Sequence, residues 1–218
     1  MKEELIKTFD RVSTGYFANS NSLHRLGTES NKLIDASSKQ ILDVLGLTNK
    51  EVIYTTGNVE NDNLCILGYL RNFSNPKHIL VEKGSSDSII MCLDKIKNFG
   101  FTYDVFDKFS LNLIRDNTVL ICFVNEFLEA DKIPAKVKTY INLVNIRNSD
   151  VNNYTFIGVD MMGICEMPYN GCLIKNKDVN LVPLIHGGKS VTKYRSGTPN
   201  APFSVILSKG IRLKYQKR

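Results

Sequence analysis

A glycine turn between an expected strand and an expected helix is the segment best suited to chemistry. The stretch Thr55-Thr-Gly-Asn-Val-Glu60 ends the β-rich run 52–56 and leads into a helical pattern over 60–73. Backbone N–H groups at the start of a helix have no partner within it, so a turn of this kind attracts anions. We therefore take Gly57 and Asn58 as candidate anion-binding residues.

The cysteines and histidines give little indication of a catalytic or metal-binding site. None of the five cysteines forms a C-x-x-C pair, and most lie among aliphatic residues, so we expect buried reduced thiols and no metal site. Cys165 has no neighbouring histidine in the sequence to lower its pKa, which favours a packing role over a nucleophile. We expect His24 to cap a helix or lie at an interface, His78 to begin a strand and His186 to lie in a turn.

Alternating strand and helix patterns position the glycine turn. Helical spacing of apolar residues is found over 28–47, 60–73, 88–99 and 202–214, and strand patterns over 52–56, 78–81, 101–106, 118–124, 137–146, 154–159 and 171–174. The last two strands fit a hairpin around Met161-Met-Gly-Ile-Cys-Glu-Met-Pro-Tyr-Asn170. This order predicts a three-layer α/β/α fold with a mostly parallel sheet. We expect one domain over 1–218, with an N-terminal helix over 1–14 and a core over 15–214.

Composition limits the remaining possibilities. The chain has 218 residues, 43% of them hydrophobic, and no apolar run approaches the roughly 18 residues of a membrane span. The charged N-terminus lacks the pattern of a secretory signal, so we expect a cytoplasmic protein without membrane contact. The net charge of +6 comes largely from dispersed lysines, with one local concentration in Lys209, Arg212, Lys214, Lys217 and Arg218. We interpret this group as a solvated helix face and expect no specific nucleic-acid partner, leaving a weak acidic or RNA partner open.

Three segments in order resemble the cysteine desulfurases of the NifS and IscS kind, which belong to the class-V aminotransferases. Phe17-Ala-Asn-Ser-Asn-Ser-Leu-His-Arg-Leu-Gly27 is similar to F-G-N-P-S-S-x-H-x-x-G, and Thr55-Thr-Gly-Asn-Val-Glu-Asn-Asp-Asn63 to T-S-G-x-T-E-x-N-N. Leu184-Ile-His-Gly-Gly188 and Arg195-Ser-Gly-Thr-Pro-Asn200 resemble L-x-H-G-G and R-S-G-T-x-N. The resemblance implies the large domain of a pyridoxal-phosphate (PLP) fold, and we expect the small domain, with its nucleophilic cysteine loop, to be missing.

The resemblance also implies which residues would bind PLP. Gly57 and Asn58 correspond to the phosphate turn, and Asn125 with Glu126 matches part of the family's V-N-N-E segment. In the family the threonine of R-S-G-T binds the phosphate of the neighbouring subunit. For Arg195 and Thr198 two interpretations therefore stay open: phosphate binding across a dimer interface, or a loop retained for packing.

The residues that perform the chemistry in the family do not match. Met161, Met162 or Gly163 occupies the place of the lysine that forms the Schiff base, and Lys175 and Lys177 lie beyond the next strand. Ser86 is nearest to the ring-stacking histidine, and Val59 replaces a threonine that donates to phosphate. Most of the D-x-A-Q strand, which carries the family's ring-nitrogen aspartate, has no match, and Asp131 is the candidate stand-in. We expect no catalytic residue and no covalently bound cofactor.

Two functions follow from this pattern. The first is a catalytically inactive desulfurase-like protein that forms a homodimer, or a heterodimer with a full-length desulfurase, in sulfur metabolism. The second is a PLP-dependent desulfurase or transferase that binds PLP non-covalently or uses a lysine of a partner subunit. A chain without a selected function is a third reading, against which the intact hydrophobic periodicity argues.

Overall fold

One seven-stranded sheet organises the chain in a computed structural model that describes residues 1–168, 170–188 and 192–216. Lys217 and Arg218 of the basic C-terminal group lie outside these residues. The strand order is β1-β7-β6-β5-β4-β2-β3, and every pairing is parallel except those that β7 makes with β1 and β6. The predicted fold class, including the β6–β7 hairpin, is confirmed. The strands are β1 Lys50–Thr55, β2 His78–Glu82, β3 Thr102–Phe106, β4 Thr118–Cys122, β5 Lys138–Asn142, β6 Phe156–Asp160 and β7 Gly171–Asn176.

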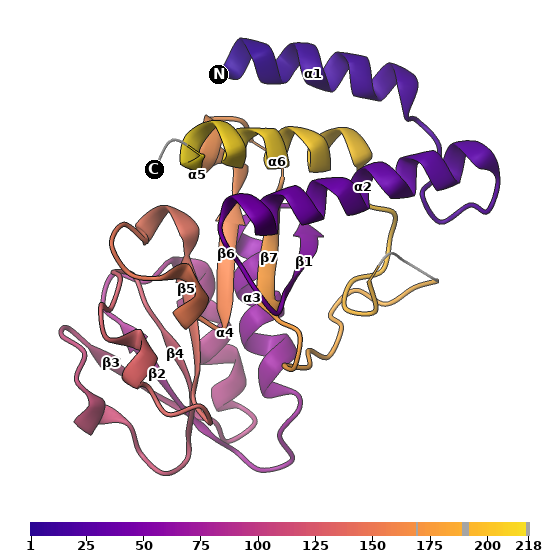
Figure 1. The fold of residues 1–218 in the computed structure, drawn as a ribbon. Coiled ribbons are helices and arrows are strands. Elements are labelled where there is room, and N and C mark those ends of the chain that lie inside the picture. The colour runs from indigo at the N-terminus through magenta and orange to yellow at the C-terminus, as the bar shows by residue number, and fades with distance from the viewer. Residues whose placement is uncertain (169, 189–191, 217–218) are drawn as a thin grey trace.

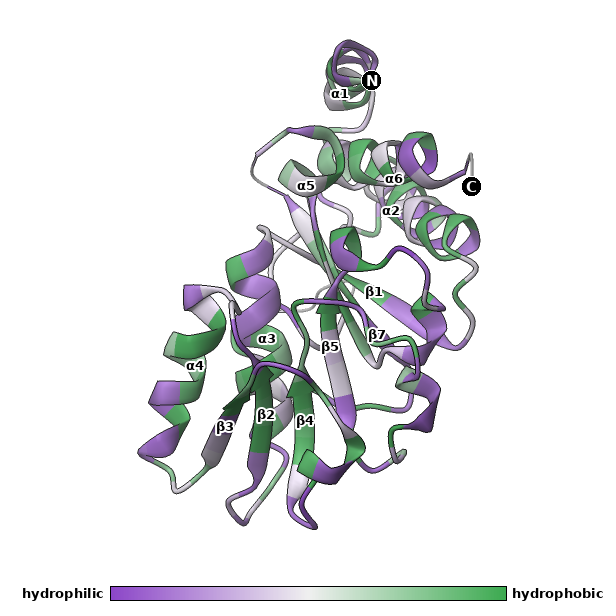
Figure 2. Ribbon diagram, turned by 90° about the vertical axis from the view of Figure 1, so that its left-hand side faces the viewer, coloured by the Kyte–Doolittle hydropathy of each residue, from purple (hydrophilic) through white to green (hydrophobic). Residues whose placement is uncertain are grey.

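Helices cover both faces of the sheet, and α1 is the outermost element (Figure 1). On one face α2 and α6 lie over β1, β7 and β6, with the short α5 beside them and α1 packed on α6. On the other face α3 packs against β6 and β7, and α4 packs against α3 and β3; β2 and β4 are strongly hydrophobic (Figure 2). The helices are α1 Lys2–Gly15, α2 Arg25–Val44, α3 Asn58–Leu70, α4 Asp87–Lys97, α5 Met161–Cys165 and α6 Ala201–Tyr215.

The connections around β5 contain no α-helix. Segments 123–137 and 143–155 form only the 3-10 turns η2 Ala130–Lys132, η3 Leu143–Asn145 and η4 Val151–Asn153. Aromatic side chains fill the space on the α2 and α6 face of the sheet instead. The ring centroids of Phe109 and Phe127 are 4.8 Å apart, and those of Phe109 and Phe123 are 5.2 Å apart. The strand predicted over 137–146 is therefore shorter, because the chain turns at Leu143 into η3.

Local sequence signals explain where several helices begin. The His24 side chain caps α2 by accepting a hydrogen bond from the Gly27 N–H at 3.2 Å, which confirms its predicted capping role. Ser86 and Asn200 cap α4 and α6 in the same way. All five cysteines are buried and free, as predicted. Among the described residues, no helix combines the length and apolarity that crossing a membrane requires.

Candidate functional site

A cavity of about 220 Å³ opens at the carboxyl ends of the central parallel strands. This edge is where open α/β sheets bind ligands, because loops and helix starts converge there. β4 leads to Phe123 and Val124, β5 ends in Asn142, and α3 and α4 contribute their first turns. The lining residues are Asn58, Asp62, Gly84, Ser85, Ser86, Ile89, Phe123, Val124, Tyr140, Asn142 and Asn145.

Asp62 is the carboxylate at the bottom of this cleft. It is 3% exposed, and its oxygens accept hydrogen bonds from the hydroxyls of Ser86, at 2.9 Å, and of Ser88 and Tyr140. Burial is the largest influence and raises the pKa of Asp62 above its ordinary value of 3.8, although all three hydroxyls act to lower it. Ser86 caps α4, Ser88 lies in α4 and Tyr140 lies in β5, so the carboxylate joins α3 to both of these elements.

Asn142 ends β5 and lines the cleft, a position that the sequence analysis missed. Its side-chain N–H donates to the Asn58 Oδ1 at 2.8 Å, and its own Oδ1 is buried without a partner in the described protein. Asn142 and Asn145 stand three residues apart at the end of a strand, which is the spacing of D-x-A-Q. This spacing could have identified Asn142 from the sequence. The expected stand-in Asp131 lies instead in the exposed turn η2 and does not line the cleft.

The turn from β6 into α5 carries no amine. The Asp160 side chain accepts from the Met162 N–H at 2.9 Å, Met161 is fully buried, and Met162 is 50% exposed. The Gly163 carbonyl accepts from the Lys214 Nζ at 2.6 Å, but Lys214 does not line the cleft. Lys175 lies four residues into β7, about 13 Å along the strand from this edge. Its buried Nζ bonds to Glu51 at 2.6 Å and to the Val179 carbonyl at 2.6 Å.

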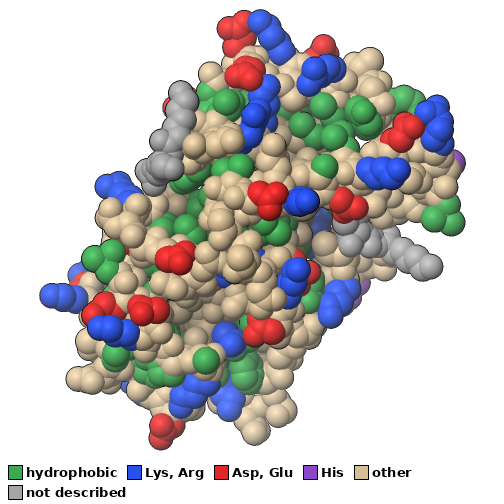
Figure 3. Space-filling model, in the orientation of Figure 1, with side chains coloured by type: hydrophobic (Ala, Val, Ile, Leu, Met, Phe, Trp, Pro, Cys, Tyr) green, Lys and Arg blue, Asp and Glu red, His purple; other side chains and the backbone are tan. Residues whose placement is uncertain are grey.

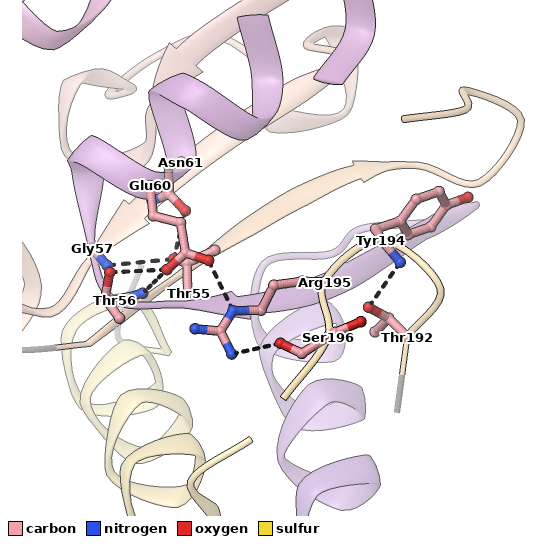
Figure 4. A network of polar contacts seen from close by, with 9 residues as sticks. All are labelled: Thr55, Thr56, Gly57, Glu60, Asn61, Thr192, Tyr194, Arg195 and Ser196. Atoms are coloured by element: carbon pink, nitrogen blue, oxygen red, sulfur yellow. Dashed lines mark hydrogen bonds and ion pairs between the residues drawn. The ribbon is translucent and has the colours of Figure 1, made fainter. Parts of the chain in front are cut away.

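The glycine turn is held by a dense polar network (Figure 4). Gly57 has a φ of 130°, a value that L side chains rarely adopt, and it caps α3. The Glu60 carboxylate accepts from the Thr56 N–H at 2.9 Å and from the Arg195 Nε at 2.8 Å. Burial acts to raise the pKa of Glu60, but Arg195 and Thr56 outweigh it and the pKa is lowered. The loop of Arg195 is thereby fastened to the first turn of α3.

The two neighbouring turns are also in direct contact. The fully buried Asn61 side chain donates to the Val159 carbonyl at 3.1 Å, and the Thr55 hydroxyl donates to Asn61 Oδ1 at 2.7 Å. A Cβ added at Gly171 would meet the Val159 carbonyl oxygen at 2.4 Å and the Gly57 Cα at 2.9 Å. Glycine at 171 is therefore required by close backbone packing.

The remaining predicted residues lie around this centre without lining the cleft. Asn125 donates from its backbone N–H and side chain to the Glu82 carboxylate, at 2.9 and 2.7 Å. The Thr198 hydroxyl donates to Asn19 Oδ1 at 3.0 Å, which joins the 196–200 loop to the loop before α2. Of the five candidate residues, only Asn58 lines the cavity. Cys165 is 2% exposed, and burial raises the pKa of its thiol, in keeping with its predicted packing role.

The cleft does not fit a lysine-linked pyridoxal phosphate. Its lining contains no lysine, its β5 position presents an amide in place of a carboxylate, and Ser86 offers no aromatic face. Val59, at the place of the phosphate-binding threonine, has no hydroxyl and is 65% exposed. The described residues also contain no group of three or more His, Cys, Asp or Glu side chains arranged for a metal ion.

Comparison with known proteins shows the family to which this fold belongs. Residues 1–113, just over half of the chain, match the aminotransferase class-V domain. The chain belongs to the class-V aminotransferase family. Within this PLP-dependent family it is cysteine desulfurase-like: it is 27% identical to the putative cysteine desulfurase IscS 1 of Bacillus subtilis, over 100% of this chain and 64% of the relative. It is 26% identical to the cysteine desulfurase IscS of Methanosarcina thermophila, over 98% of this chain and 59% of the relative.

Solved structures show the same class-V fold. A NifS-like protein superposes with a TM-score of 0.88 at 16% identity, covering 99% of this chain and 67% of that protein. DndA from Streptomyces lividans superposes with a TM-score of 0.84 at 17% identity, covering 97% and 68%. The chain thus spans about 60% of the length of the two curated relatives and about two thirds of these structures.

Proposed function

We propose that this class-V aminotransferase-like chain performs no desulfurase chemistry of its own and acts by association, with a second copy or with a full-length desulfurase, in sulfur metabolism. The main support is the β6–α5 turn, where Asp160, Met162 and Gly163 provide caps and packing but no amine toward the cleft. Imine formation requires an amine, and without it the cofactor has no covalent anchor.

The surface around the Arg195–Thr198 loop supports association. Four exposed apolar side chains lie on segments that are bonded to this loop: Phe17 is 74%, Leu23 99%, Val59 65% and Ile185 43% exposed. The bonds from Thr198 to Asn19 and from Arg195 to Glu60 hold the loops that carry them in one region. Clustered exposed apolar side chains favour protein–protein contact.

The first test combines cofactor trapping with turnover. We expect no borohydride-stable mass increase after incubation with PLP and no sulfide from cysteine. A lysine-linked adduct together with sulfide release would contradict the proposal. Gly163→Lys is the matched variant, because it returns an amine to the turn; an adduct on that lysine alone would show that the missing amine is the defect.

The second test addresses association. Light scattering after size exclusion, alone and with a full-length desulfurase, is expected to show a dimer or a mixed complex. Leu23→Asp should weaken it about tenfold or more, since a charge would be buried at a contact. Met91→Asp on α4 is the control, because Met91 is 68% exposed on another helix. A monomer with no complex, or equal effects of both substitutions, would contradict the proposal.

A second candidate is non-covalent use of PLP with an amine from a partner. The observation that favours it is the retained turn at Gly57 and Asn58, whose helix-start N–H groups suit a phosphate. Borohydride trapping on a partner's lysine, seen only when both chains are mixed, would support this candidate over the first.

A further inference from the structure

A second cavity, of about 280 Å³, lies between three helices and shares no residue with the cleft. It is formed where α1 and α2 lie against α6, the region in which Figure 3 shows basic, acidic and apolar side chains together. Its lining residues are Thr8, Arg11, Leu33, Ala36, Ser37, Gln40, Val205, Lys209 and Arg212. Three of these residues are cations, and none is a carboxylate.

Within the described residues, Lys209 is the one cation of the three that forms an ion pair, and Lys209, with a smaller contribution from Arg212, lowers the pKa of the same Glu4 carboxylate. The Lys209 Nζ contacts the Glu4 carboxylate at 2.7 Å and the Thr8 hydroxyl at 2.9 Å. Arg11 and Arg212 form no ion pair within the part of the chain that the structure describes. The cavity therefore keeps an excess of positive charge.

Arg212 carries the second observation. Its Nε is buried and has no hydrogen-bond partner within the described protein. A position in the last turn of α6 explains a basic residue there, because cations are favourable at a helix C-terminus. It does not explain a buried N–H donor without an acceptor, which is costly in a folded protein.

The uncharged lining residues add donors and an apolar wall. Ser37 uses its hydroxyl on the Leu33 carbonyl at 2.8 Å, and the Gln40 Oε1 accepts from the Ser208 hydroxyl at 2.6 Å. The amide N–H group of Gln40 is thus the part left for a ligand. Leu33, Ala36 and Val205 provide aliphatic surface for a short carbon skeleton.

We propose that this pocket binds a small organic oxyanion with two negative charges, held by the guanidinium groups of Arg212 and Arg11. Planar guanidinium groups bind carboxylate and phosphate oxygens through paired N–H donors. A volume just below the usual 300–1,000 Å³ of ligand sites fits a small metabolite. Since the lining spans α1, α2 and α6, the ligand joins all three helices.

Calorimetry and thermal unfolding with succinate and with inorganic phosphate test the proposal, with sodium chloride at matched ionic strength as the blank. Both dianions are expected to bind and to raise the Tm above the blank; preference for one identifies the source as a dicarboxylate or a phosphate ester. Arg212→Gln and Arg11→Gln should each weaken binding about tenfold. Arg25→Gln is the control, since Arg25 lies on α2 in an exposed pair with Glu29.

Unchanged binding in Arg11→Gln, or a response to both dianions no larger than to chloride, would overturn the site. If Arg212→Gln does not fold, Arg11→Gln decides alone, because Arg11 is exposed. A loss as large in Arg25→Gln as in Arg11→Gln would mean general charge screening and would also overturn the proposal.

Discussion

The turn at Gly57 and the turn at Gly163 are neighbours, yet the first keeps the glycine and glutamate of the family's motif, as Gly57 and Glu60, while the second has no lysine. In the first, Glu60, Asn61 and the loop of Arg195 bond to one another and to the sheet. The second turn stands where the resemblance implies the lysine that forms the Schiff base. Ser86 and Val59, the other departures, also stand at positions where the resemblance implies cofactor-binding side chains. The difference indicates that residues with structural contacts are retained where residues implied to bind the cofactor have changed.

The strongest way to break this comparison is to force the two turns apart. Gly171→Ala places a Cβ against backbone atoms of Val159 and Gly57, neither of which can move alone. We expect a loss of about 3 kcal/mol in the free energy of unfolding, measured by urea denaturation. Gly15→Ala is the control, because nothing lies within 4 Å of its added Cβ. Equal stability of the two variants would contradict the contact.

Removing the cation of the retained turn is expected to have the next largest effect. Arg195→Met leaves the Glu60 carboxylate, whose side chain is only 14% exposed, without its charged partner. The expected loss in the free energy of unfolding is about 2 kcal/mol. Lys7→Met removes one side of a pair in which both side chains are at least 75% exposed, and should cost under about 0.5 kcal/mol. Similar losses would mean that the network is not structural.

A third prediction concerns Glu126, the other glutamate that matches a family motif. Burial acts to raise the pKa of Glu126, but the backbone N–H groups of Ser149, Asn148 and Arg147 donate to it and lower the pKa to about 2. Since this lies below the ordinary 4.5, the ionised form stabilises the fold. That stability is complete above about pH 4.5 and is lost as pH falls toward about 2.

Glu126→Gln should therefore cost about 1 kcal/mol at neutral pH and much less near pH 2.5. Urea denaturation of both proteins at several pH values measures the difference. Glu3→Gln is the control, because Glu3 forms only an exposed pair. A Glu126→Gln effect independent of pH would show that the ionised carboxylate is not what holds the 147–149 segment.

The smallest effect should come from restoring a lost residue. Val59→Thr returns the family's hydroxyl at a position that is 65% exposed, so the change in the free energy of unfolding should be under about 0.5 kcal/mol. Denaturation measures this, and Val105→Thr, at a 57% exposed position, is the control. A large change in the free energy of unfolding for Val59→Thr alone would show that this position contributes to the fold, which would contradict the comparison.

The fold could be predicted because most elements have a clear hydrophobic periodicity and are bounded by turn-forming residues. The alternation of strands and helices, the hairpin at the β6–β7 turn and the His24 cap are all local signals. Asn142 was missed because β5 is short and its flanks form 3-10 turns, so the segment lacked the usual flanking helices. The contact of Thr198 with Asn19 joins residues 179 apart in sequence, which no local pattern reveals.

The pairing of β1 with β7 has a consequence for synthesis of the chain. β1 ends at Thr55, but β7, its one neighbour in the sheet that the described residues form, begins at Gly171, and α2 packs against α6, which begins at Ala201. A ribosome adding roughly 5–20 residues per second leaves these segments without their partners for several seconds. The apolar face of α2, with Ile34 and Ile41, is exposed during that time. Chaperones are therefore most needed before α6 is synthesised, while this apolar face of the nascent chain is uncovered.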